Sequence, residues 1–169
     1  MSFKSLGLFF KHELETETVS TRKCLERIPE SLFDYKPHER SMPMKYLTLM
    51  IADLPNWVAS TVEKSDVDFA TYKPVQPKTT AELVGHFENG VINAYKALEK
   101  VTDEELSELF YIKNNGVTLA SSRKDDSIMS LINHLVHHRG QLTVYMRLNN
   151  ILVPAIYGPS ADENPFQKP

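Results

Sequence analysis

The sequence contains a single cysteine, Cys24, so it can form neither an internal disulfide nor a zinc site built from several cysteines. No run of about 18 apolar residues occurs, which excludes a transmembrane helix of the usual length. The formal net charge is only -3 at pH 7, so no basic field points to nucleic acid or to an anionic membrane. These absences leave proteins and small molecules as the expected partners.

The remaining composition is that of a globular protein. The 169 residues are 41% hydrophobic and 24% charged, which fits a single domain over residues 1–169. The N-terminal stretch MSFKSLGLFFKHELE has a short apolar patch but soon turns acidic and lacks the small-residue cleavage site of a signal peptide. We therefore expect a helix there and a cytoplasmic protein.

Apolar residues at helical spacing predict four long helices. The first runs from about Lys4 to Arg27 and ends before the helix-breaking Pro29. The second begins near Ser41 and Pro43, where serine can cap and proline is tolerated.

The second helix contains Pro55, which predicts a kink or a break. The third opens at a capping box, Thr79 to Glu82, and continues to Leu98. The fourth begins at Asp125 or Asp126 and runs to about Asn149.

The segments between these helices are polar or rich in proline. Residues 63–78 read as a connection, and Thr102 to Glu105 form a second capping box for one short helical turn. Asn115-Gly116 lies between β-prone runs and predicts a small hairpin or an extended lid. The proline-rich tail from Ile151 should lie on the surface. The predicted fold is all-α, a four-helix bundle with long loops and a short hairpin before the last helix.

Three of the six histidines fall within five residues of the fourth predicted helix. His138 takes a core position between Leu135 and Leu142, and His134 lies one turn earlier on the same face. His137 falls toward the flank, since successive residues are about 100° apart around a helix.

Two readings of this pair remain open. Imidazoles at positions i and i+4 can bind one metal ion, as in the helix of metalloproteases, although the glutamate of that motif is missing. Alternatively, the two side chains hydrogen-bond to other helices, since a buried polar group costs free energy unless it is satisfied. A further metal ligand would have to come from His12, His86, a carboxylate or water. His12, His38 and His86 are each expected to be solvated.

The three residues that follow His138 are expected to have structural roles. Arg139 and Gln141 are expected to be cross-ties within the bundle. Gly140 costs a helix about 1 kcal/mol relative to alanine, which close approach of another helix or space for a ligand could offset.

Two blocks of sequence carry a family resemblance. HLVHHRGQLTVYMRL followed by VPAIYGPSADE, and upstream FDYKPHERSMPMKYLTLMIADLPNW, resemble the DinB-like (YfiT-like) superfamily in order and spacing. The resemblance implies a four-helix bundle with a divalent metal, usually zinc or nickel, held by three histidines. Two of them correspond to His134 and His138.

The third histidine of the resemblance, in the second helix, corresponds to Met50. Methionine is a soft, weak ligand for zinc or nickel and commonly fills gaps in a core. Asp53, one turn further, could supply an oxygen ligand instead. Three readings follow: the metal is held with Asp53 or water, the metal site is often empty, or the pocket has lost the metal and binds something else.

The resemblance implies a metal-dependent enzyme, a transferase of low-molecular-weight thiols or a hydrolase, in stress response or detoxification. In a thiol transferase the metal lowers the pKa of the thiol and presents a thiolate, and His137 is a candidate for moving protons. The alternative is a non-catalytic ligand-binding or scaffold bundle without metal.

The family's name refers to DNA-damage induction, but the charge of this sequence gives no footprint for DNA binding. The resemblance also implies a homodimer formed through helix faces. Trp57, Tyr157 and Phe166 are expected to be exposed aromatic residues that mark a contact surface.

Overall fold

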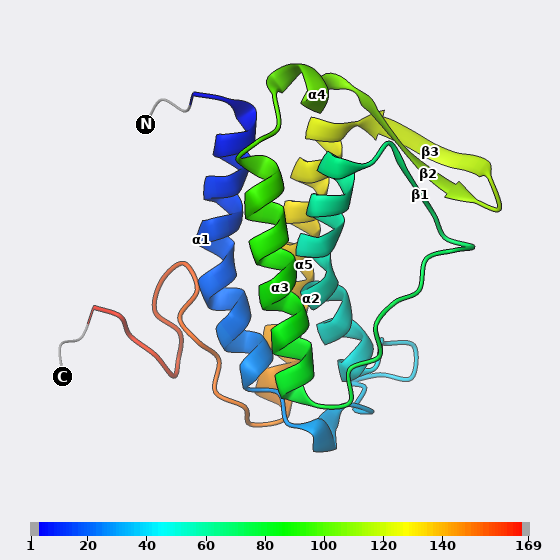
Figure 1. Cartoon of the computed structure of the whole chain (residues 1–169). Coiled ribbons are helices and arrows are strands. Elements are labelled where there is room, and N and C mark those ends of the chain that lie inside the picture. Colours follow the sequence, from blue (N-terminus) through cyan, green and yellow to red (C-terminus); the bar gives the residue numbers. More distant parts are fainter. Residues whose placement is uncertain (1–3, 167–169) are drawn as a thin grey trace.

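The computed structural model describes residues 4–166, in which four long helices lie side by side (Figure 1). Helix α1 lies against α3 and α5, and α2 lies against the same two helices, so α1 and α2 occupy opposite corners. The predicted bounds agree with the observed ones to within a few residues, since each helix has a local apolar period. The four helices are α1 (Leu6–Glu26), α2 (Met44–Glu63), α3 (Thr80–Leu98) and α5 (Lys124–Leu148).

Side-chain caps fix where several helices begin. Thr79 accepts a hydrogen bond from the Glu82 amide at the start of α3, although the Glu82 carboxylate binds the Lys78 amide rather than closing the box. The box at Thr102 is complete and opens the short helix α4 (Asp103–Ser107). Both predicted helix starts are therefore confirmed, although only the box at Thr102 is closed by its glutamate.

Pro55 does not break α2, which is continuous from Met44 to Glu63. Of the predicted kink or break, the break does not occur, because Pro55 is itself buried in a helix that packs against both α3 and α5. Packing of the flanking turns outweighs the loss of one backbone hydrogen bond.

A three-stranded sheet lies at one end of the helices, so the all-α prediction is incomplete. Strands β2 (Leu109–Asn114) and β3 (Val117–Arg123) form the predicted hairpin, whose turn residues Asn115 and Gly116 have positive φ angles of 48° and 76°. This is the backbone that a two-residue hairpin turn requires.

The third strand, β1 (Asp66–Asp68), was not predicted and pairs in parallel with β2. Its sequence, DVD, has no strand-like signal of its own, and its pairing depends on residues far along the chain. The Asp68 carboxylate accepts hydrogen bonds from the amides of Asn115 and Gly116, which joins β1 to the hairpin turn.

The chain between β1 and α3 runs back along the length of the helices, so that α3 starts at the same end as α2 (Figure 1). It passes over α2 and places the rings of Phe69 and Tyr72 against Trp57. The stretch predicted as a plain connection, residues 63–78, thus contains strand β1 followed by a long segment that lies over α2. We call this segment, residues 69–78, the cover. A short 3-10 helix, η1 (Glu30–Leu32), follows α1.

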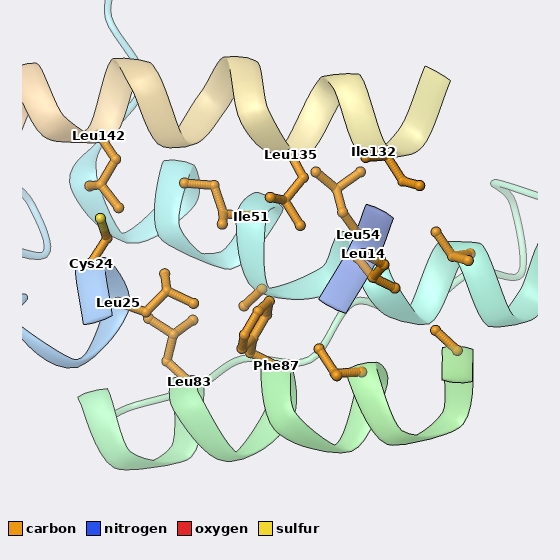
Figure 2. Packing of buried hydrophobic residues seen from close by; sticks show 14 of the residues in the cluster. Leu14, Cys24, Leu25, Ile51, Leu54, Leu83, Phe87, Ile132, Leu135 and Leu142 are labelled. Carbon is orange, nitrogen blue, oxygen red and sulfur yellow. The ribbon is translucent and has the colours of Figure 1, made fainter. Parts of the chain in front are cut away.

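The core lies between the four long helices (Figure 2). Helix by helix, the labelled core residues of Figure 2 are Leu14, Cys24 and Leu25; Ile51 and Leu54; Leu83 and Phe87; and Ile132, Leu135 and Leu142.

Cys24 is fully buried in this core, and burial raises the pKa of its thiol to about 11, which makes it unreactive near neutral pH.

Among the helices of residues 4–166, none is both long and apolar enough to cross a membrane.

Candidate functional site

Helix α5 brings the side chains of His134 and His138 together. Their Nε2 atoms are 2.7 Å apart, as the i and i+4 spacing predicts. His138 is only 7% exposed, whereas His134 is exposed to solvent. The expectation that both point inward is therefore correct for His138 alone, and His134 lies where the core meets the surface.

Gln141 selects the tautomer of the His138 ring. The Nδ1 atom of His138 is 2.8 Å from Gln141 Oε1, and Gln141 Nε2 is 3.1 Å from His137 Nε2. An amide oxygen can only accept, so His138 carries its proton on Nδ1 and leaves the Nε2 lone pair facing His134. Gln141 thus orients the histidines of its own helix and is not the cross-tie between helices that we expected.

The pKa of His134 is lowered, first by burial of part of the ring and then by the neighbouring His138 and His137. Protonation of one imidazole disfavours protonation of the next when the rings lie this close. The His134 ring is therefore mainly neutral at pH 7.

A cavity of about 480 Å³ lies between α2, α5, β2 and the cover that follows β1. Met50 lines it together with His134, so the position at which the resemblance calls for a third histidine shares a cavity wall with one member of the histidine pair. Met50 is half-buried on the cavity wall and does not fill the core. The full lining is Tyr46, Leu49, Met50, Asp53, Leu54, Trp57, Phe69, Tyr72, Pro74, Ile112, Leu131 and His134.

Asp53 is the acceptor of a hydrogen-bond network in the same wall. Its Oδ1 accepts from His86 Nε2 at 2.8 Å, and its Oδ2 accepts from Trp57 Nε1 at 2.8 Å and from the Tyr72 hydroxyl. Burial alone would raise the pKa of Asp53, but the bonds from His86, Tyr72 and Trp57 outweigh it and lower the pKa. Asp53 is therefore ionised at neutral pH.

The network corrects two expectations. His86 is not a solvated histidine, since its side chain is 19% exposed, pairs with Asp53 and lies 3.2 Å from Asn56 Nδ2. Trp57 is not an exposed contact residue, since it is half-buried and lines the cavity. The orientation of His86 toward α2 could not be predicted, because the apolar pattern of the helix marks its neighbour Phe87, and not His86, as the inward residue.

The three-ligand metal site implied by the resemblance does not fit these residues. Within residues 4–166, no group of three or more His, Cys, Asp or Glu side chains is placed to hold a metal ion. The Asp53 oxygens are engaged by three donors, and Met50 offers a thioether where an imidazole is required. Only the two imidazoles of His134 and His138 converge.

Arg139 forms the cross-tie that we expected. It is 2% exposed, and its Nη2 lies 2.5 Å from Glu17 Oε2 on α1. Its Nη1 donates to the hydroxyls of Ser20 and Thr21 on the same helix. The Tyr157 hydroxyl of the C-terminal tail also binds both partners, so this pair joins α5, α1 and the tail.

A model of the DinB family matches residues 1–165 of the 169. The chain belongs to the DinB family. The DinB-like fold is also that of two crystal structures, which are too distant in sequence to show more than the fold. One is a DinB-like protein from Bacillus cereus ATCC 10987, with a TM-score of 0.67 and 22% identity over 88% of this chain and 95% of that one. The other is the DinB-like protein YjoA from Bacillus subtilis, with a TM-score of 0.67 and 18% identity over 86% of this chain and 95% of that one.

One curated relative of this DinB protein is the uncharacterized protein YrdA of Bacillus subtilis strain 168. The two are 56% identical over 36 residues, which is 21% of this chain and 22% of YrdA. The match spans about a fifth of the relative's length, and the name of the relative assigns no activity.

Proposed function

We propose that this DinB-family protein binds a small, largely apolar molecule in the cavity between α2, α5 and the cover that follows β1. The observation that supports this is the cavity itself. Its volume of about 480 Å³ lies within the range of about 300–1,000 Å³ that is usual for small-molecule sites. Every lining residue except Asp53 and His134 is apolar or aromatic.

The test is to fill the cavity with a side chain. Neopentylbenzene, a compact neutral hydrocarbon, serves as the probe in isothermal titration calorimetry and thermal unfolding. Leu131→Trp places a ring in the cavity and is expected to weaken binding at least tenfold. Leu148→Trp is the matched control, because Leu148 is 57% exposed on the same helix and does not line the cavity. Absence of binding by the wild type, or equal binding by both variants, contradicts the proposal.

A second candidate, a metal-dependent enzyme such as a thiol transferase or hydrolase, is favoured by one observation. The Nε2 atoms of His134 and His138 converge, and Gln141 holds the His138 ring with its Nε2 turned toward His134. A partner of this kind on the second nitrogen is characteristic of metal-binding histidines. The missing element is the third protein ligand at Met50.

Met50→His distinguishes this candidate from the first. If the site is a depleted ligand set, the variant binds zinc or nickel at least tenfold more tightly than the wild type, and His134→Ala abolishes the gain. Metal content of protein purified without a histidine tag gives the direct comparison. One equivalent of metal already present in the wild type, and lost in His134→Ala and His138→Ala, would favour the enzyme over the metal-free binding protein.

A further inference from the structure

Three aromatic rings meet in the cavity wall beside its only carboxylate. The ring centroids of Trp57 and Tyr72 are 5.0 Å apart at an interplanar angle of 50°, and those of Trp57 and Phe69 are 6.0 Å apart at 59°. Because the planes are tilted, the rings do not stack flat on one another. All three line the same cavity as Asp53.

The charges around this cavity have one sign. Asp53 is its only acidic lining residue, and no lysine or arginine lines it. His86, Lys64 and Lys73 line a neighbouring, smaller cavity of about 210 Å³, which shares Asp53, Trp57 and Tyr72 with the larger one. Asp53 Oδ1 accepts one hydrogen bond among the described contacts, from His86, whereas a carboxylate oxygen can accept two. An anionic ligand would meet a carboxylate and no compensating cation.

Aromatic faces attract cations through the ring quadrupole, and cages of several rings are the usual recognition site for alkylated ammonium groups. On the basis of the proposed ligand-binding function, we propose that the ligand is an organic cation whose alkylammonium group lies against Trp57, Phe69 and Tyr72, next to Asp53. The aliphatic part of the wall, which includes Leu49, Met50, Leu54, Ile112 and Leu131, holds the hydrocarbon body of this ligand.

A pair of ligands with the same shape and different charge tests the inference. Benzyltrimethylammonium differs from neopentylbenzene only by a positively charged nitrogen in place of the quaternary carbon. A merely apolar pocket prefers the hydrocarbon, because the ammonium group loses hydration on entry. We expect calorimetry on the full chain to show the cation binding at least tenfold more tightly. Tighter binding of the hydrocarbon overturns the inference but leaves the proposed function standing. Failure of the wild type to bind the hydrocarbon overturns the proposed function and, with it, the inference that rests on it.

Two variants identify the groups responsible. Asp53→Asn keeps the size of the side chain and removes its charge, so the cation should lose at least tenfold more affinity than the hydrocarbon does. Phe69→Leu removes a ring that is 46% exposed and should weaken binding of the cation severalfold. Asp66→Asn is the control, because Asp66 pairs with Lys113 outside the cavity. Equal losses for both ligands in Asp53→Asn and Phe69→Leu would contradict the cage.

Discussion

At the scale of single residues, Arg139 and Glu17 form the most demanding contact in the protein. Both are buried, at 2% and 7% exposure, and removing two charges from water costs several kcal/mol per ion unless further hydrogen bonds compensate. The compensation comes from Ser20 and Thr21 on α1 and from Tyr157 in the tail. The tail is therefore held at a charged site in the interior of the helices.

Glu17→Gln should destabilise the protein by about 3–5 kcal/mol, since the Arg139 charge remains buried without an anion. Urea unfolding measures the change. Glu26→Gln is a suitable control, because Glu26 forms an exposed pair with Arg22 and such pairs are worth at most about 1 kcal/mol. Similar losses in the two variants would show that the buried pair is not what holds α1, α5 and the tail together.

Residue spacing was enough to predict part of the candidate site. His134 and His138 lie one helical turn apart in a single element, and the Met50 position singled out by the resemblance lines the same cavity as His134. The bond from His86 to Asp53 could not be predicted in this way. It joins two helices across 33 positions of the chain, and only the packing of α2 on α3 turns the two side chains toward each other.

At the scale of elements, one glycine sets the distance between α1 and α3. A Cβ atom built at Gly7 would lie 2.4 Å from the backbone oxygen of Leu98, which cannot move without displacing its helix. At Gly140 we expected either a close approach of another helix or space for a ligand. A Cβ atom built there meets nothing within 4 Å, which excludes the close approach. The structure offers no reason for glycine at position 140.

Gly7→Ala should therefore destabilise the protein by about 1–3 kcal/mol through overpacking. Gly85→Ala on α3 is the matched control, because its Cβ meets nothing within 4 Å. Alanine should stabilise that helix by up to about 1 kcal/mol. Chemical denaturation of both variants checks the pair, and a loss of stability in both would mean that helix spacing is not the cause.

The elements also show where prediction from sequence ends. Helices and the hairpin carry their own local patterns, so their places were predicted. Strand β1 pairs Asp66 with Tyr111, 45 residues away, and three residues are too few to show a period. The strand exists because the hairpin offers it an edge, which is a property of the tertiary structure.

At the scale of the whole molecule, the long connection between α2 and α3 makes the cavity. A minimal bundle would join neighbouring helices by short turns. Here the chain returns along α2 and adds Phe69, Tyr72 and Pro74 to the cavity wall. The homodimer remains a prediction, which light scattering would test.

The chain contains one tryptophan, and that tryptophan is a wall of the cavity. Its indole donates to an ionised carboxylate and packs against two rings from the cover. The emission of this protein at long wavelengths therefore comes from the site alone. The unlabelled protein therefore carries its own fluorescent reporter. A bound ligand, a displaced cover or a change at Asp53 would each alter the emission spectrum of this one residue.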